Sequence, residues 1–153
     1  MKAKLFKKSI NNELYLRLIP LDNTDYKSLI LEMKKIYFKQ IICSTDIILQ
    51  IIENLIKKQG MLLSIDFTDN VDKSNQDYIR SLIIKLRDGT IDISTFIEEF
   101  IWITDDQSID INYLYLQDRN REKFYVYSNG IIEGDNLKSF FDEVLTESIK
   151  QVL

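Results

Sequence analysis

The residues with the most chemical potential in this 153-residue chain are carboxylates, and many of them stand between Met61 and Asp110. Carboxylates can bind a divalent cation, act as a general acid and base, or form an acidic surface for a partner. Those that we single out, with the one tryptophan among them, are Asp66, Asp69, Asp72, Glu98, Glu99, Trp102, Asp105, Asp106 and Asp110. The rest of the chain decides among these uses.

A calcium loop is the first use to test, because Asp66, Thr68 and Asn70 fit its first three ligand positions. The sixth position of such a loop needs glycine for a sharp turn, but the chain has Val71 there. The twelfth position, where a glutamate normally binds the ion through two oxygens, is Asp77. We therefore interpret 68–74 as a polar turn and expect no metal site.

Enzymatic catalysis lacks most of its usual residues in this chain. There is no histidine, which removes the commonest general base and every triad that needs an imidazole. Cys43 is the single cysteine, so an iron–sulfur cluster and an intramolecular disulfide are excluded, and the isolated glycines form no phosphate-binding loop. The acidic pairs around Trp102 could serve a glycosidase, but acidic pairs on an exposed helix need no such role. We expect neither catalytic residues nor a cofactor.

Charge is unevenly distributed along the chain, whose net charge is −4. Residues 1–60 contain 11 basic and 6 acidic residues, whereas residues 61–110 contain 4 basic and 11 acidic residues. An acidic tract repels a phosphate backbone and attracts a basic protein. Tyr113 and Tyr115 belong to an aromatic run that could stack on RNA bases, but the acidic surroundings favour packing or a protein interface instead. Nucleic acid is therefore not the expected partner.

Hydrophobic periodicity predicts a single α+β domain over residues 1–153, with a mainly antiparallel sheet. An N-terminal hairpin and a C-terminal meander pack on about five helices. The expected strands are 5–10 and 13–19 around Asn11-Asn12, a buried strand 61–67, and the meander within 109–134. The expected helices are 25–41, 45–59, 74–88, one from about 94, and 137–153. Four lysines suit an edge position for the first strand, namely Lys2, Lys4, Lys7 and Lys8.

Local signals refine this outline. Asn129-Gly130 predicts a type I′ turn with positive φ at both residues. Gly60 is expected just beyond the C-terminus of its helix, and Ser74 with Asp77 is expected to form a capping box. The expected inner face of the helix from about 94 consists of Phe96, Ile97, Phe100 and Ile101.

In its length, its missing catalytic motifs and its acidic stretch from Asp66 to Asp110, the chain resembles a class of bacterial immunity proteins. These proteins protect bacteria against nuclease toxins of contact-dependent growth-inhibition and related polymorphic toxin systems. The single cysteine and the lack of a signal-length apolar run predict a cytoplasmic protein, and the missing catalytic residues predict a non-catalytic one. The resemblance implies a tight, stoichiometric complex with a cognate toxin domain, which blocks the active site or an essential surface of the toxin.

If the resemblance holds, the partner is a basic nuclease domain whose substrate groove accepts carboxylates placed like phosphates. The expected partner-binding residues are the nine named first, with Tyr113 and Tyr115 as further aromatic anchors. Two alternatives stay open: a small carboxylate- or metal-dependent enzyme, and an RNA-binding module that uses the basic N-terminal region and the aromatic strands. No apolar run reaches membrane-spanning length, so a membrane role is not expected.

Overall fold

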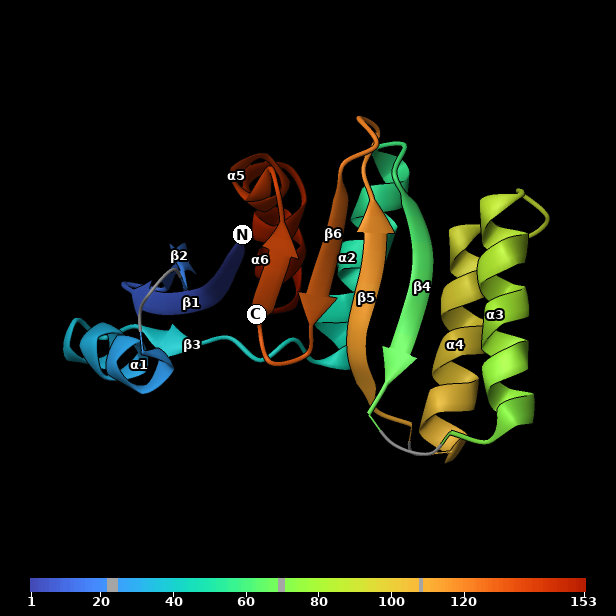
Figure 1. The fold of residues 1–153 in the computed structure, drawn as a ribbon, viewed down its shortest axis with the longest axis horizontal. Helices are drawn as coiled ribbons and strands as arrows, with labels where there is room; N and C mark the ends of the chain where they lie inside the picture. The colour runs from blue at the N-terminus through green and yellow to red at the C-terminus, as the bar shows by residue number, and fades with distance from the viewer. Residues whose placement is uncertain (22–24, 69–70, 108) are drawn as a thin grey trace.

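The computed structural model describes residues 1–21, 25–68, 71–107 and 109–153, and it confirms a small α+β domain (Figure 1). The described residues form seven strands in one antiparallel sheet. The strands are β1 (Lys2–Ile10), β2 (Glu13–Pro20), β3 (Lys39–Gln40), β4 (Met61–Phe67), β5 (Ile111–Gln117), β6 (Lys123–Tyr127) and β7 (Ile131–Gly134). The helices are α1 (Tyr26–Lys35), α2 (Thr45–Lys57), α3 (Lys73–Arg87), α4 (Ile93–Gln107), and a C-terminal run of α5 (Leu137–Phe140), a π segment (Phe141–Leu145) and α6 (Thr146–Val152).

The sheet joins the two ends of the chain. Its strand order is β2-β1-β7-β6-β5-β4, and β3 pairs with the second half of β1. Lys2 stands opposite Glu133, and Ala3 stands opposite Ile132. The predicted hairpin and the predicted meander are therefore parts of one continuous sheet.

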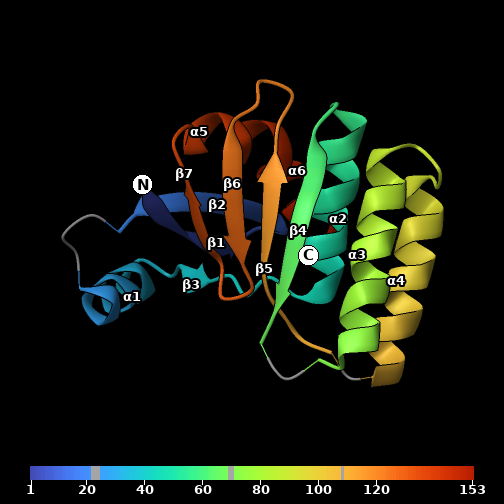
Figure 2. The same ribbon diagram turned by 45° about the vertical axis from the view of Figure 1, so that its right-hand side comes forward.

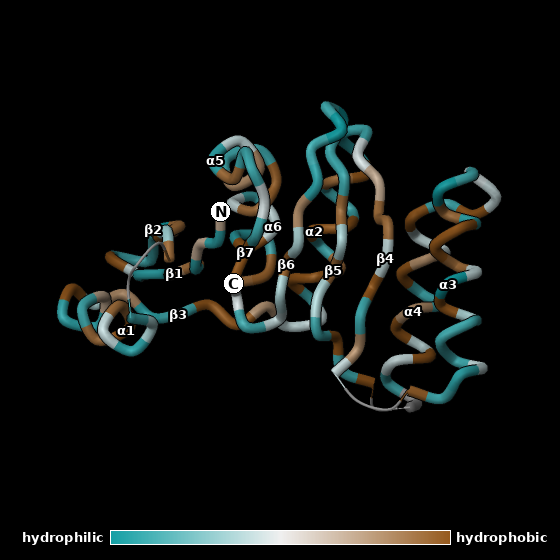
Figure 3. Tube along the Cα trace, in the orientation of Figure 1, coloured by the Kyte–Doolittle hydropathy of each residue, from teal (hydrophilic) through white to brown (hydrophobic). Residues whose placement is uncertain are grey.

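The main core lies on one face of this sheet, under α2 and the C-terminal helical run (Figures 1 and 2). Figure 3 shows hydrophobic residues recurring along α2, α3 and α4 with hydrophilic residues between them. A smaller cluster packs Phe6 against Leu29, Met33 and Phe38 under α1. Because neighbouring strand residues point to opposite faces, Leu5 joins the main core while Phe6 joins the small one.

The prediction that the β1 lysines mark a sheet edge is wrong. β1 lies between β2 on one side and β7 and β3 on the other. Lys4 is fully buried, and its ammonium donates to the carbonyl oxygens of Ile41, at 3.0 Å, and of Asn129. Those carbonyls replace the hydrogen bonds that water would otherwise provide. Lys4 therefore ties the β3–α2 connection and the β6–β7 turn to β1.

The β6–β7 turn differs from the predicted type I′ geometry. Of the two residues predicted to stand at the centre of the turn, Gly130 has a positive φ of 82° and Asn129 does not. The Gly130 N–H donates to the Tyr127 carbonyl at 2.9 Å, which places Gly130 at the end of a turn that starts at Tyr127. A Cβ atom on Gly130 would collide with the Ile41 carbonyl oxygen. The turn is thus shaped by its packing on the β3–α2 connection.

Two helices end differently from the prediction. α1 stops at Lys35 rather than near Ile41, because Tyr37 adopts a positive φ of 67° and the Phe38 N–H donates to the Met33 carbonyl at 2.9 Å. After α2, Gln59 and not Gly60 has the positive φ, 68°. In both places the chain closes the helix with the hydrogen bonds of a Schellman motif. The early end of α1 frees Lys39–Gln40 to form β3.

The N-terminus of α3 also differs from the prediction. Ser74 lies inside the helix, and Asp72 is the capping residue. The Ser74 N–H donates to Asp72 Oδ1 at 3.1 Å, which satisfies one of the free donors of the first turn. The predicted capping box of Ser74 with Asp77 is therefore wrong.

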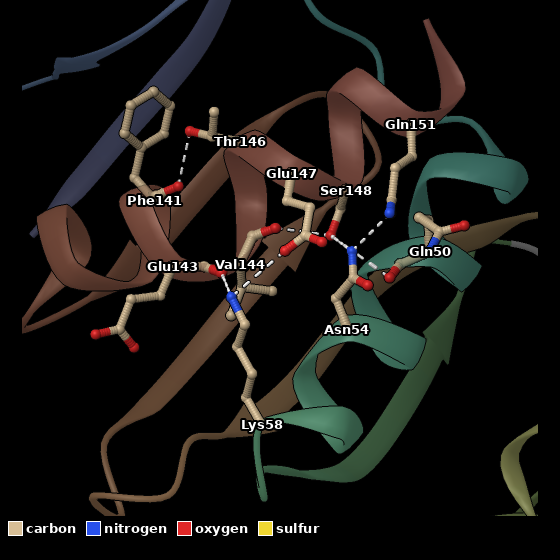
Figure 4. A network of polar contacts seen from close by, with 10 residues as sticks. All are labelled: Gln50, Asn54, Lys58, Phe141, Glu143, Val144, Thr146, Glu147, Ser148 and Gln151. Atoms are coloured by element: carbon tan, nitrogen blue, oxygen red, sulfur yellow. Dashed lines mark hydrogen bonds and ion pairs between the residues drawn. The ribbon is translucent and has the colours of Figure 1, made fainter.

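The C-terminal run contains a π segment where one regular helix was expected, and a polar network joins it to α2 (Figure 4). Asn54 Nδ2 donates to Ser148 Oγ at 2.8 Å and to Gln151 Oε1 at 2.9 Å. Ser148 Oγ in turn donates to the Val144 carbonyl at 2.7 Å. Because Asn54 and Ser148 are buried, these bonds satisfy groups that would be costly to leave unpaired. They fix how the last helix sits on α2.

Candidate functional site

Helix α4 packs one side on the core and leaves the opposite side in solvent. Its buried residues include Phe96, Phe100 and Ile103. At 3.6 residues per turn, the far side carries four exposed residues, which we call the α4 outer face: Glu98, Ile101, Trp102 and Asp105. Ile101 was predicted on the inner side, and that prediction is wrong. Ile103 is buried instead, because it lies one helical turn beyond Phe100 on the side of the helix that faces the core.

The α4 outer face combines negative charge with an exposed aromatic ring. The 15 residues of α4 include neither lysine nor arginine. Asp105 stands in the last turn, where the partial negative charge of the helix terminus disfavours a carboxylate by about 0.3–1 kcal/mol. Trp102 is 66% exposed between these carboxylates. Tryptophan is a residue that protein interfaces favour, so this face has the composition of a docking surface.

Glu99 is held at the boundary between α4 and α3. The Tyr78 hydroxyl donates to Glu99 Oε2 at 2.7 Å. This hydrogen bond is the main cause that raises the pKa of Tyr78 above its ordinary value, and burial and the negative charge of Glu99 add to it. Glu99 therefore joins the two helices.

A second candidate surface is the face of β5 and β6 that points away from α2. In the views of Figures 1 and 2, none of the described helices lies over it. Tyr115 stacks on Tyr125 with ring centroids 4.4 Å apart, and the centroids of Tyr113 and Tyr127 are 5.3 Å apart. We call these four residues the tyrosine face.

Carboxylates border the tyrosine face. Asp66 stands opposite Tyr113 in the sheet, and Glu133 stands opposite Tyr125. Partial burial raises the pKa of Tyr127, and the negative charges of Glu133 and Asp66 raise it further. The side chain of Asn112 donates to Asp66 Oδ2 at 2.8 Å. Each of these carboxylates would repel a phosphate, which counts against nucleic acid on this face.

The eleven residues predicted from the sequence therefore do not form one surface. Glu98, Trp102 and Asp105 come together on the α4 outer face, whereas Asp66, Tyr113 and Tyr115 come together on the open side of the sheet. Helix α3 packs against β4, whereas α4 packs against α3 and α2. Of the remaining predicted residues, Glu99 is described above and Asp72 caps α3. The Asp110 carbonyl accepts from the Thr68 N–H at 3.0 Å. Asp69 and the side chain of Asp106 lie outside the described residues.

The largest shifts in pKa lie away from both surfaces. Burial lowers the pKa of Lys4 to about 8, although the nearby Cys43 thiolate would raise it. Burial also raises the pKa of Cys43 to about 11. Both side chains are buried, and the Lys4 ammonium is engaged by two carbonyls. We assign them a structural role, because a nucleophile needs both access and a low pKa.

Sequence reasoning missed several residues of these surfaces. Ile101 was assigned to the core, and Tyr125, Tyr127 and Glu133 were not among the predicted partner-binding residues. The alternation of Tyr113 with Tyr115 and of Tyr125 with Tyr127 is the signal that could have grouped them, since alternate strand residues share a face. The sequence does not give the register of β5 and β6, which places Tyr113 opposite Tyr127 and Tyr115 opposite Tyr125, so the four residues could not be grouped.

Neither metal ligands nor relatives point to a reaction. Among the described residues, no group of three or more cysteine, aspartate or glutamate side chains is placed to hold a metal ion. Within the same part of the chain, no helix has both the length and the apolar composition to cross a bilayer. No family model matches the chain, and neither curated proteins nor solved structures give a significant match.

Proposed function

We propose that this protein is a non-catalytic binding protein of the immunity type, which neutralises a basic toxin domain through the α4 outer face. The observation that carries the proposal is Trp102, 66% exposed on a helix without lysine or arginine and flanked by Glu98 and Asp105. An exposed indole lowers solubility, and a carboxylate such as Asp105 in the last turn of a helix lowers stability when no basic residue stands there. A partner that covers both explains why the chain retains them.

The α4 outer face supports this function better than the tyrosine face does. The tyrosines already contact one another, so a partner would gain less by covering them. Glu98, Trp102 and Asp105 lie within two helical turns, or about 10 Å along the axis. Such a spacing lets the indole fill a pocket while both carboxylates meet basic side chains around its rim.

Inhibition follows from charge and size. A nuclease domain has a basic substrate groove, and carboxylates on a rigid helix would occupy it in place of phosphates. A stable complex needs about 800 Å² of buried surface on each partner, which exceeds one helix face. Neighbouring residues such as Tyr78 and Glu99 would extend the contact.

The test is protection from the nuclease domain encoded immediately upstream of this protein in its source cell. Co-expression of that domain with this chain should restore growth, and the two proteins should co-purify. The Trp102→Ala variant and the Glu98→Gln/Asp105→Asn double variant should weaken the complex at least tenfold. The matched control is Glu32→Gln/Asp142→Asn, which removes the same charge at two exposed positions on other helices. If both double variants protect equally well, the assignment of the α4 outer face is wrong.

One observation supports a second function, because four tyrosines on an open sheet face resemble a base-stacking platform in their arrangement. An RNA-binding protein of this kind would be retained on a polyanionic resin and released with a steep dependence on salt. Flow-through at low salt counts against it and leaves the proposal above in place.

A further inference from the structure

Strand β4 was predicted as buried, but it forms an edge of the sheet, and a groove runs along it. Among the described strands, β5 is its single partner. The groove has a volume of about 490 Å³, and its walls are residues 63–67 of β4, including the carboxylate of Asp66, the facing stripe of α3, and Tyr113 of β5. The α3 stripe includes Ile79, Arg80, Ile83, Ile84 and Arg87. Figure 2 shows α3 running beside β4.

The groove follows the edge of the strand and not one of its faces. Side chains of consecutive β4 residues alternate between the two faces of the sheet, yet all five residues from Leu63 to Phe67 line the groove. The feature that they share is the outer edge of the backbone. Every second residue of an edge strand directs its N–H and C=O outward, and these groups are a template for another strand.

The other edge of the sheet contains proline and both signs of charge, whereas β4 contains one carboxylate and two register shifts. β2 contains Glu13, Arg17 and Pro20, and charge and proline both discourage pairing with another strand. β4 has the sequence Met-Leu-Leu-Ser-Ile-Asp-Phe, without lysine, arginine or proline. Its register with β5 shifts at Leu62/Ser64 and again at Asp66/Phe67, which leaves a regular stretch between the two shifts. Ser64, Ile65 and Asp66 are therefore the part of the edge best prepared for pairing.

The groove also has a charge opposite to that of its surroundings. Two of the four basic residues between Met61 and Asp110, Arg80 and Arg87, line it. They stand seven residues apart on α3, so about 10 Å separates them along the helix axis. Arg87 suits the C-terminal turn of α3, whereas Arg80 in the middle of the helix gains nothing from the helix dipole. Arg80 is paired with Asp77 at 3.6 Å, but this ion pair is exposed and contributes little to stability. Ile84 lies between them and is 59% exposed.

We propose that this groove binds an extended acidic segment of another protein, which adds to the sheet as a strand beside β4. The segment pairs its backbone with the β4 edge. Its apolar side chains point to the floor at Ile79 and Ile83, and its carboxylates point to Arg80 and Arg87. Residues 63–67 extend over about 16 Å, enough for five residues of the segment. This binding mode is independent of the α4 outer face and of the proposed function.

The probe is the fluorescently labelled peptide acetyl-Glu-Val-Glu-Val-Glu-Val-Glu-amide, titrated against the full chain at physiological salt. We expect a dissociation constant on the order of 100 µM or tighter, as for a small, transient contact. A peptide with lysine in place of glutamate should bind at least tenfold more weakly. A peptide with proline in place of the central valine should also lose binding, because proline lacks the N–H that pairs with β4.

The protein variants separate the groove from general charge effects. Arg80→Glu/Arg87→Glu should weaken binding of the acidic peptide at least tenfold. Lys73→Glu/Lys85→Glu makes the same change in charge on the same helix, at exposed positions that do not line the groove, and should change binding less than twofold. Equal effects of the two double variants would overturn the proposal.

Amide chemical shifts of the unmodified protein provide a readout that does not depend on the folding of any variant. Addition of the peptide should shift amides in 63–67 and 76–87 and slow hydrogen exchange along β4. Shifts confined to the lysines of β1 would mean that the peptide binds the basic N-terminal region, and the proposal would fail. It would also fail if the free chain formed dimers through β4 and the peptide did not dissociate them.

Discussion

One region, which we call the Lys4 junction, is formed by Lys4, Ile41, Cys43, Asn129 and Gly130. There the buried Lys4 ammonium donates to two backbone carbonyls, and Gly130 occupies a position with no room for a Cβ atom. On the α4 outer face, two carboxylates and an indole stand exposed on a helix that has no basic residue. At the junction the polar groups are paired within the chain, and their removal should cost stability. On α4 the groups add nothing to the fold, and their removal should cost binding alone. The contrast separates residues that stabilise the fold from residues that we propose bind a partner.

Among the residues of these two regions, the largest effect should follow Lys4→Met, which keeps the length of the side chain and removes its charge and donors. The buried Ile41 carbonyl and the partly buried Asn129 carbonyl would each lose a hydrogen bond, so we expect the free energy of unfolding to fall by about 2–4 kcal/mol. Urea denaturation measures this. Lys7→Met, on the same strand but partly exposed, is the control and should cost less than 1 kcal/mol. A loss below 1 kcal/mol for Lys4→Met would remove the junction from the comparison.

The pH dependence of stability should show the junction as well. The pKa of Lys4 is lowered from 10.5 to about 8, so between these values the unfolded chain holds more protons at this position. The free energy of unfolding should therefore rise with pH there, by at most about 1.4 kcal/mol per pH unit. The pKa of Cys43 is raised from 9.0 to about 11, so this thiol makes stability fall as pH rises between those values.

The two contributions can be separated with Cys43→Ala. In the unmodified chain, stability should rise from pH 8 to 9 and then level off as the thiol opposes the amine. In Cys43→Ala the rise should continue beyond pH 9. Chemical denaturation at fixed salt between pH 7.5 and 10 tests this, and an unchanged profile in the variant would contradict the coupling.

A smaller effect of opposite sign is expected at the end of α4. Asp105→Asn removes a carboxylate from the last turn of the helix, so stability should increase by about 0.3–1 kcal/mol. The same change should weaken the complex that we propose with a toxin domain. Asp46→Asn is the matched control, because Asp46 lies in the first turn of α2, where the charge is favourable and its loss should destabilise. A loss of stability in Asp105→Asn would mean that Asp105 serves the fold.

The smallest change in stability is expected for Trp102→Ala, within about 0.5 kcal/mol, because the ring is mostly exposed. Phe100→Ala on the same helix should cost about 3–5 kcal/mol, because Phe100 is fully buried. Thermal and urea unfolding of both variants give the comparison. A cost above 1.5 kcal/mol at Trp102 would show that the indole supports the fold.

Periodicity was sufficient to predict the elements with long, regular patterns. The α2 stripe, the α3 stripe with its stop at Asp88-Gly89, and the extent of β4 all follow from residue spacing alone. The Asn11-Asn12 turn is also confirmed, with φ values of 51° and 67°. In these places the local preference of the chain and its tertiary environment agree.

The failures lie where a distant part of the chain decides the local structure. The Gly130 turn is shaped by Ile41, and the burial of Lys4 depends on β7, which is remote in the sequence. The predicted partner-binding residues lie on separate surfaces for the same reason, because distant parts of the chain decide where each of them lies. Glu98, Trp102 and Asp105 share one side of α4, but they were predicted together with Asp66, which lies on β4 at the open side of the sheet. Arg80 and Arg87 could not be placed in a groove before the edge strand was known.

The place of β1 in the sheet has a consequence for synthesis. Its partner β7 leaves the ribosome more than a hundred residues later, so the first half of β1, which β3 does not pair, keeps one side open until β7 has been synthesised. At typical translation rates this interval is on the order of ten seconds. During it, β1 is an exposed edge, and its four lysines discourage pairing with other nascent chains. When β7 pairs with β1, Lys4 becomes buried. The residue that discouraged pairing with other chains then donates hydrogen bonds to the carbonyls of Ile41 and Asn129.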